Sequence, residues 1–225
     1  MSVPDPPRSA ASLFGDRVDV AIEYAELLAG PGVERGLLGP REAARLWDRH
    51  IVNCAVLGEL IPAGSSLIDV GSGAGLPGVV LAVLRPDLNV TLVEPMARRT
   101  AFLTMCIEHL HLERVDVRRA RAEELAGTVT ADVVTSRAVA RLPRLLSWTI
   151  PLAWPAGIVL ALKGASVDAE IAELGVPGHG ARVPATLAAA GVDNLEVVRV
   201  GCGIIDPMAT VVRVELRKKA RRSRR

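Results

Sequence analysis

The stretch Leu67–Gly78, LIDVGSGAGLPG, decides how the rest of the sequence is organised. It begins with an apolar run around the carboxylate of Asp69 and turns abruptly at Gly71, Gly73 and Gly75, after which apolar residues resume. This order is typical of a β-strand, a tight glycine turn and a helix. Glycines let the backbone approach a ligand closely, and the following helix directs free N–H groups into the same space. The pattern therefore predicts a nucleotide-like ligand.

Two further positions narrow the class of ligand. Leu76 stands where the dinucleotide fingerprint has its third glycine. A second expected strand, 89–93, ends at Glu94, about 20 residues beyond the turn, where a carboxylate can bind the hydroxyl pair of a ribose. S-adenosylmethionine and NAD both carry that ribose, so both stay open here. A glycine turn that merely packs a strand against a helix is the alternative without a ligand.

Beyond the glycine turn, expected strands alternate with helical stretches, which is typical of a doubly wound, parallel α/β sheet. The later strands are expected at 115–119, 132–135 and 158–162, with a closing antiparallel hairpin at 195–200 and 210–216. Ligands bind such sheets at the carboxyl ends of the strands. The side chains expected at these ends are those of Ala122, Glu123, Arg137 and Lys163, and the helix expected at 97–110 opens with Arg98 and Arg99.

The N-terminal part is expected to form a helical cap over residues 13–62, in front of a domain over 63–216. Apolar residues at helical spacing predict one helix from Leu13 to Leu28 and another from Pro40 to Leu60. On the second helix, His50 belongs to a group of polar residues that either touch a substrate or face solvent. Residues 1–12 are predicted to be disordered, and they lack the order of a secretory signal.

Composition restricts the class of protein. The 225 residues are 50% hydrophobic but only 3% aromatic, so the core must consist of aliphatic residues. Three widely separated cysteines without C-x-x-C spacing indicate a reducing compartment and no metal site, so a cytoplasmic protein is expected. The uncharged stretch 145–162 contains Pro151, Pro155 and Gly157, which argues against a membrane span.

Charge is unevenly distributed along the chain. The formal net charge is +2, but the segment 217–225 holds seven basic residues and no acidic one. Such a tail, expected to be disordered, either binds phosphates in a salt-sensitive manner or only aids solubility.

Individual cations point to an anionic ligand. A guanidinium placed just past a central strand, as expected for Arg137, is costly to bury without a partner. An ion pair with Glu123 is the structural alternative. Arg98 and Arg99 open a helix, where the dipole disfavours positive charge. Lys163 either contacts phosphate or is an ordinary strand-end lysine.

The acceptor chemistry is narrowed by what the sequence lacks. It has no Asn-Pro-Pro-aromatic stretch to hold an exocyclic amine and no Pro-Cys dipeptide to attack a pyrimidine. A ring nitrogen such as guanine N7 needs neither, because its lone pair is free and the reaction is a direct displacement aided by alignment. With so few aromatic residues, a flipped base is expected to stack on arginine, Trp47 or Trp148.

Several motifs together resemble the RsmG (GidB) family of bacterial 16S ribosomal RNA guanine-N7 methyltransferases. The motifs are ERGLLGPRE at 34–42, LWDRHIVN at 46–53, DVGSGAGLPG at 69–78, SRA at 136–138 and LKG at 162–164. The resemblance covers about residues 13–216 and implies a Rossmann-like class I methyltransferase with a mostly parallel seven-stranded sheet.

The resemblance also implies a ligand and site residues. The cofactor is S-adenosylmethionine, and its positions fall on the glycine loop (Asp69, Gly71, Gly73, Gly75 and Leu76), on Glu94, on Ala122 and Glu123, and on Arg137, which is also the catalytic candidate. His50, Arg98, Arg99 and Lys163 are candidates for contact with RNA. The expected partner is 16S ribosomal RNA or the 30S subunit, and the expected state is a monomer. An NAD-dependent oxidoreductase and a non-catalytic RNA-binding assembly protein remain the alternatives.

Overall fold

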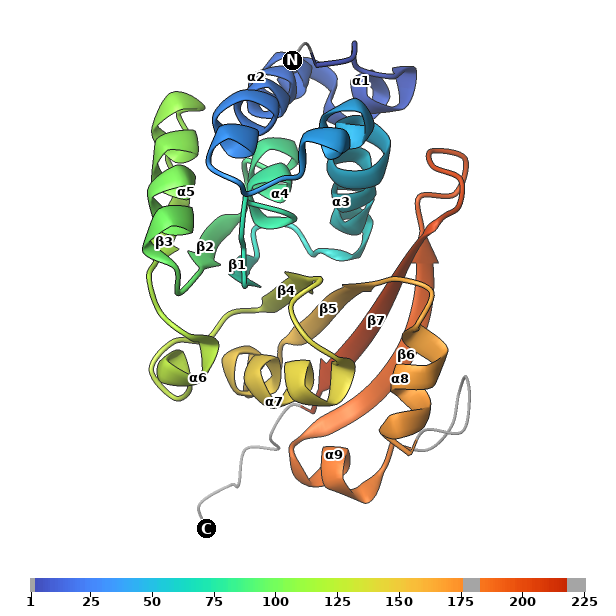
Figure 1. Cartoon of the computed structure of the whole chain (residues 1–225). Coiled ribbons are helices and arrows are strands. Elements are labelled where there is room, and N and C mark those ends of the chain that lie inside the picture. Colours follow the sequence, from blue (N-terminus) through green and yellow to red (C-terminus); the bar gives the residue numbers. More distant parts are fainter. Residues whose placement is uncertain (1–2, 176–182, 218–225) are drawn as a thin grey trace.

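The computed structural model describes residues 3–175 and 183–217, which form a sheet between two layers of helices (Figure 1). In this part of the chain the sheet has seven strands in the order β3-β2-β1-β4-β5-β7-β6. Strands β1 to β5 pair in parallel, whereas β7 runs antiparallel to β5 and β6. The mostly parallel sheet with a closing hairpin is therefore confirmed. The strands are β1 Ser66–Val70, β2 Asn89–Val93, β3 Val115–Arg118, β4 Val133–Arg137, β5 Ile158–Lys163, β6 Val192–Val200 and β7 Ala209–Leu216.

The central strands are buried on both faces, and β5 is accordingly apolar along its whole length up to Lys163. In β5, Leu160 and Leu162 belong to the core on the cap side, whereas Val159 and Ala161 belong to the core on the opposite side. Successive side chains of a strand point to opposite faces, so one short apolar run fills two cores.

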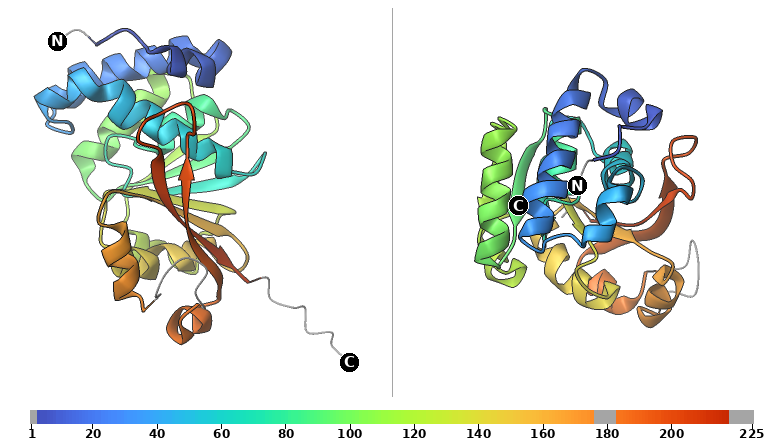
Figure 2. Two further views of the ribbon diagram at one scale, coloured as in Figure 1. Left: turned by 90° about the vertical axis from the view of Figure 1, so that its right-hand side faces the viewer. Right: turned by 45° about the horizontal axis from the view of Figure 1, so that its top comes forward.

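The helices divide between the two faces of the sheet, as the turned views show (Figure 2). The N-terminal cap covers one face together with α4 Gly78–Leu84 and α5 Ala97–His109. The helices on the other face are α6 Ala122–Leu125, α7 Leu142–Ala153, α8 Val167–Glu173 and α9 Ala185–Ala189. Helix α9 lies between the last expected parallel strand and the closing hairpin, at a position where no element was predicted.

The cap begins earlier than predicted, so the prediction of disorder over residues 1–12 is wrong for its described part. A helix, α1, spans Arg8–Phe14, and the side chains of Ala10 and Phe14 are buried in the cap. The indole Nε1–H of Trp47 also donates a hydrogen bond of 2.8 Å to the carbonyl of Pro4. Burial of apolar side chains and a satisfied indole keep this segment in place.

The rest of the cap consists of short helical pieces of different kinds. The first half contains η1 Gly15–Arg17, α2 Val18–Leu27 and η2 Leu28–Gly32. The expected helix over Pro40–Leu60 is helical throughout, but it is not one regular α-helix. It passes from a 3-10 helix (η3, Pro40–Arg45) to a π-helix (η4, Leu46–Val52), a short α-helix (α3, Asn53–Ala55) and a second 3-10 helix (η5, Val56–Leu60).

The strand order reverses beside β1, which creates the crevice where ligands bind in such sheets. Strand β1 lies between β2 and β4, and Val70 is paired with Ser136 at the carboxyl ends of β1 and β4. The glycine turn and Arg137 follow these two residues directly. The segment 218–225, which contains most of the predicted basic tail, lies outside the described residues.

Candidate active site

The glycine loop is a tight turn fixed by its own backbone. Gly71, Gly73 and Gly75 have φ angles of +69°, +60° and +100°, a region that favours glycine. The N–H groups of Gly71 and Ser72 both donate to the carbonyl of Val93, at 2.8 and 3.1 Å. Gly71 and Gly73 are only partly buried, so their backbone is accessible to a ligand.

Asp69, which the sequence predicted as a cofactor contact, supports the loop from inside. Its side chain has no exposed surface, and it accepts hydrogen bonds from the N–H of Gly78 at 3.1 Å and from the hydroxyl of Thr135 at 3.2 Å. Burial raises the pKa of this carboxyl to about 6, although hydrogen bonds to it act in the opposite direction. Asp69 therefore ties β1 to the start of α4 and to β4.

The cap also holds the glycine loop, through Tyr24, which belongs to the segment 13–62 that was expected to precede the methyltransferase domain. The hydroxyl of Tyr24 donates a buried hydrogen bond of 2.7 Å to the carbonyl of Ala74. Burial raises the pKa of Tyr24 well above its ordinary value, so this phenol remains a donor. No feature of the sequence around Tyr24 indicated this contact, because it joins residues 50 positions apart.

Glu94 lies beside the glycine loop, as the sequence predicted. Its carboxylate accepts from the N–H of Gly73 at 3.1 Å and from the N–H of Met96 at 3.0 Å, and only 1% of the residue is exposed. Arg99 contacts the same carboxylate at 3.4 Å, which gives this cation a partner within the protein. Arg98 is exposed and has no hydrogen bond or ion pair among the described residues.

Arg137 links the sheet to the cap. Its Nη2 group donates to the carbonyl of Arg49 at 3.2 Å and to Nδ1 of His50 at 2.6 Å, and Nη1 contacts the sulfur of Cys54 at 3.1 Å. The ion pair with Glu123 that was the structural alternative is not formed: Glu123 is exposed on α6. The remaining N–H groups of Arg137, on Nε and Nη1, are left for other partners.

His50, which the sequence predicted as an RNA contact, supports Arg137 in the structure. Because a guanidinium only donates hydrogen bonds, Nδ1 of His50 must be the acceptor and Nε2 must carry the proton. Nε2 then donates to Glu42 at 2.6 Å. Burial and the nearby Arg137 lower the pKa of His50, which favours this neutral form. Only 7% of His50 is exposed, and both of its ring nitrogens have a hydrogen-bond partner inside the protein.

Lys163, for which the sequence left a phosphate contact open, has two hydrogen-bond partners within the protein. Its ammonium group donates to Glu170 at 2.6 Å and to the carbonyl of Ala140 at 2.9 Å, and both charged side chains are 8% exposed. Glu170 also accepts from the N–H of Leu142 at 2.7 Å and from the hydroxyl of Ser166 at 2.8 Å. This cluster joins β5, α8 and the start of α7, and neither Glu170 nor Ala140 was singled out from the sequence.

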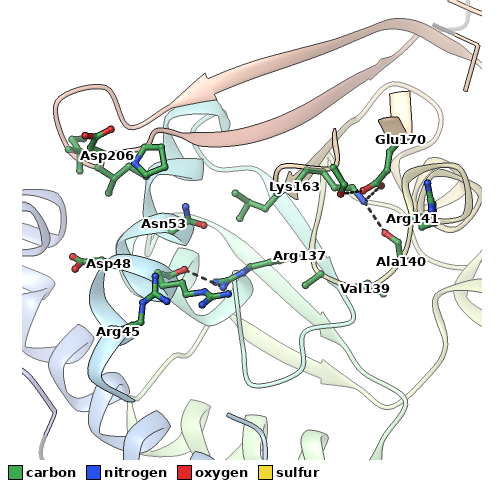
Figure 3. Close-up of a pocket in the computed structure, with 18 residues that line it drawn as sticks. Arg45, Asp48, Asn53, Arg137, Val139, Ala140, Arg141, Lys163, Glu170 and Asp206 are labelled. Carbon is green, nitrogen blue, oxygen red and sulfur yellow. Dashed lines mark hydrogen bonds and ion pairs between the residues drawn. The ribbon is translucent and has the colours of Figure 1, made fainter. Parts of the chain in front are cut away.

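A cavity of about 950 Å³ lies between the cap, the ends of β4 and β5, and the β6–β7 loop (Figure 3). Arg45, Arg49 and Asn53 line it on the cap side, and Arg137 lies at its centre. The β6–β7 loop contributes a further wall, which the sequence did not indicate. That wall comprises Ile204, Ile205, Asp206 and Pro207.

The glycine loop itself does not line this cavity, but the two sites adjoin. Val139 lines the cavity and also packs on the loop, since a Cβ atom at Gly71 would lie 2.6 Å from its Cγ2. The hydroxyl of Ser136, one residue before Arg137, is buried without a hydrogen-bond partner among the described residues.

The tryptophans predicted as stacking platforms lie elsewhere. Trp47 is 3% exposed and donates a hydrogen bond to the carbonyl of Pro4. Cζ of Arg144 lies over the ring of Trp148, 4.9 Å from its centroid. None of the cavity's lining residues within the described ranges is aromatic. Residues 3–175 and 183–217 also contain no cluster of three or more potential metal ligands, and no helix long and apolar enough to cross a membrane.

Comparisons with known proteins bear on both sequence and fold. Residues 17–176 match the family model GidB, described as rRNA small subunit methyltransferase G. A curated relative from Thermobifida fusca (strain YX), named Ribosomal RNA small subunit methyltransferase G, is 55% identical over 209 residues, which are 93% of this chain and 84% of the relative.

Solved structures share the fold at low sequence identity. A SAM-dependent O-methyltransferase from Thermotoga maritima is 14% identical with a TM-score of 0.54, covering 75% of this chain and 66% of the other. A SAM-dependent methyltransferase from Aquifex aeolicus is 18% identical with a TM-score of 0.51, covering 87% and 98%. This likeness confirms the Rossmann-like architecture expected from the strand and helix pattern.

Proposed function

Because this chain belongs to the rRNA small subunit methyltransferase G (GidB) family, we propose that it transfers the methyl group of S-adenosylmethionine to N7 of a guanine in 16S ribosomal RNA. The observation that carries the proposal is the 55% identity to a member of that family across almost the whole chain. The substrate atom and the decoding-region loop of 16S RNA come from the family resemblance. The structure supports the proposal with a glycine loop that adjoins a large open cavity.

The methyl donor is S-adenosylmethionine, and the residues at the strand ends suit it. The partly exposed backbone of Gly71 and Gly73 can approach the methionine portion, beside the side chain of Leu76. Glu94 hydrogen-bonds to Gly73, so a ribose hydroxyl pair held by Glu94 would adjoin the same loop. The unpaired hydroxyl of Ser136 is a further polar group ready for a partner. We assign the adenine to Ala122 and Glu123 at the start of α6.

The reaction requires little from protein side chains beyond placement. When bound, the cofactor supplies an electrophilic methyl group on a sulfonium. Guanine N7 would accept the methyl group with its own lone pair while the electrons of the C–S bond stay on sulfur, so the glycine loop and Arg137 would only have to hold the donor and the base in line. No proton has to be removed, so the reaction needs no general base. The role of the chain is to align the two reactants.

We assign Arg137 a role at the junction of the two sites. Its guanidinium is held by the cap and lies at the centre of the cavity, with N–H groups on Nε and Nη1 still available. These groups suit a carboxylate or the O6 oxygen of guanine, which lies next to N7. Contact with O6 would orient the base without covering the reacting nitrogen.

We further propose that the chain works as a monomer in the cytoplasm, where ribosomal subunits are assembled. Light scattering after size-exclusion chromatography is expected to give the mass of one chain, about 24 kDa from the 23.8 kDa sequence mass. A stable dimer would contradict this part of the proposal.

The decisive experiment is a methyl transfer assay with tritiated S-adenosylmethionine. Small subunits from cells that lack the enzyme serve as substrate, and the RNA is then digested to nucleosides. We expect the label in 7-methylguanosine. Label in another nucleoside would contradict the assignment to N7, and binding of subunits without any transfer would favour a non-catalytic assembly protein.

A further inference from the structure

The cap presents a row of polar side chains to the cavity. Arg45, Arg49 and Asn53 all line it, and each is four residues from the next. They border or lie within the π-helix Leu46–Val52, in which hydrogen bonds join residues five apart. Residues four to five positions apart therefore lie above one another, which agrees with the fact that all three side chains line the same cavity; Arg45 and Asn53 are labelled in Figure 3.

The two arginines of this row keep most of their hydrogen-bonding capacity. Arg45 is exposed and has no ion pair or hydrogen bond within the described ranges. Arg49 has one contact, at 3.5 Å, with Glu42, and its side chain is 52% exposed, so the pair contributes little. The closer partner of Glu42 is His50, at 2.6 Å. One acidic residue, Asp48, also lines the cap side of the cavity. Together with the two arginines it leaves a net positive charge on that side.

The position of this row relative to the reacting centre is fixed. Arg137 donates to the backbone carbonyl of Arg49 and to the ring of His50, which joins the π-helix directly to the end of β4. The row of Arg45, Arg49 and Asn53 is therefore held in place by Arg137, which lies at the centre of the cavity, and not by a flexible loop.

The β6–β7 loop forms a facing wall of different chemistry. Ile204, Ile205 and Pro207 give it an aliphatic surface, which the exposed carboxylate of Asp206 interrupts. The N–H groups of Ile204 and Ile205 both donate to the carbonyl of Gly201 at 3.0 Å, which closes the loop on itself. One side of the cavity therefore suits a sugar-phosphate backbone, and the other suits the face of a base.

We propose that this cavity is the entry site for a single-stranded segment of the substrate RNA: Arg45 and Arg49 bind phosphates next to the target guanine, and the aliphatic β6–β7 loop covers the base. The proposal rests on the proposed function and identifies where that substrate binds. Arginine matches phosphate geometry, and unstacked bases in single strands are the usual targets of RNA recognition. A base here lies against aliphatic and guanidinium groups, since no described aromatic residue lines the cavity.

The test compares variants that remove or keep the two charges. In the double variant Arg45→Gln/Arg49→Gln, affinity for small subunits is expected to fall roughly tenfold or more, because charge-assisted hydrogen bonds to phosphate are removed. The slope of log affinity against log salt is expected to decrease by about 1.4, or 0.7 for each single-strand phosphate that is no longer neutralised. Arg45→Lys/Arg49→Lys should restore most of the salt dependence. Affinity for S-adenosylhomocysteine is measured on each variant to show that the cofactor site is intact.

Arg114→Gln is the matched control. Arg114 is an exposed arginine at the amino end of β3, which is the edge strand on the side of the sheet away from the cavity. An unchanged salt slope and affinity in the double glutamine variant would overturn the inference, as would an equal loss in the Arg114 control. These outcomes are separate from a failure of the proposed function, which would appear as absence of 7-methylguanosine with the wild-type protein.

Discussion

Gly78 shows, at the scale of one residue, why a position of the glycine motif cannot accommodate a side chain. A Cβ atom at this position would collide with the side chain of Leu92 and lie 2.7 Å from Oδ2 of Asp69. We expect Gly78→Ala to lower the free energy of unfolding by about 1–3 kcal/mol, as in other overpacked cores, and to weaken binding of S-adenosylhomocysteine. Urea denaturation and calorimetry measure the two effects. In Gly30→Ala, where a Cβ would meet nothing within 4 Å, neither quantity should fall.

Asp69 predicts a pH dependence of stability with a defined sign. Its pKa is about 6 in the folded protein and 3.8 in the unfolded chain, so between these values the folded state holds a proton that the unfolded state has lost. Stability must therefore fall as pH rises from about 4 to 6, by about 3 kcal/mol for this group. In Asp69→Asn the amide can accept from Gly78 and donate to Thr135, and this decline should disappear.

The measurement is urea denaturation of the wild type and Asp69→Asn between pH 4 and 7. Asp87→Asn is the control without a slope in this range, because a hydrogen bond from Arg85 lowers the pKa of Asp87, and the unfolded pKa of this carboxyl, 3.8, already lies below pH 4. The stabilisation from Asp87 is present above its unfolded pKa and is lost as pH falls. A constant difference between wild type and Asp69→Asn across the range would show that this carboxyl does not titrate there.

The sequence predicted which residues gather at the strand ends but not which way their side chains point. Glycine spacing and the acid of Glu94 follow local rules, so both were found. The partners of Asp69, His50 and Lys163 were not visible in the sequence because each is set by tertiary contacts. Arg137 illustrates the difference: its partners on the cap lie more than 80 residues earlier in the chain, at separations of 83 to 88.

At the scale of elements, α8 acts as a clamp on the start of α7. Removal of the carboxylate in Glu170→Ala leaves the ammonium of Lys163 buried with only a carbonyl partner, and the N–H of Leu142 without an acceptor. We expect a loss of about 3–5 kcal/mol in the free energy of unfolding, the usual result of breaking a buried ion pair. Urea denaturation at pH 7 provides the value.

Glu173→Ala is the comparison on the same helix, because Glu173 pairs with Arg141 at the surface, where the two side chains are 46% and 65% exposed. It should cost less than about 1 kcal/mol. Equal losses in the two variants would mean that the buried cluster does not hold α7 and α8 together.

Elements buried on both faces were the easiest to predict. Strands β1, β4 and β5 are short apolar runs between turn residues, and the structure has them where the pattern placed them. The segment around Arg8–Phe14 was misjudged because its order depends on packing against the cap, which a proline-rich sequence does not indicate. The π-helix of the cap was likewise not visible, since a pattern of apolar residues does not distinguish it from an α-helix.

At the scale of the whole molecule, the last described residues and the cavity lie at opposite ends of β5. The antiparallel pairing of β5 and β7 places Leu216 beside Gly157, at the amino end of β5, whereas Lys163 at its carboxyl end adjoins the cavity. The basic segment that follows β7 therefore starts at the edge of the sheet opposite the cap arginines. Contacts made by the two regions should be with separate parts of a large RNA substrate.

This separation leads to a prediction for the basic segment. Deletion of residues 218–225 removes six basic residues. We expect the salt slope of subunit binding to decrease by about 0.7–0.9 for each phosphate that the shortened chain no longer binds, and affinity to fall with it. At saturating subunit concentration, the rate of methyl transfer should stay close to that of the wild type, because the deletion touches neither the glycine loop nor the cavity. A deletion that lowers the maximal rate would place the segment at the reacting centre, and an unchanged salt slope would show that it does not contact RNA.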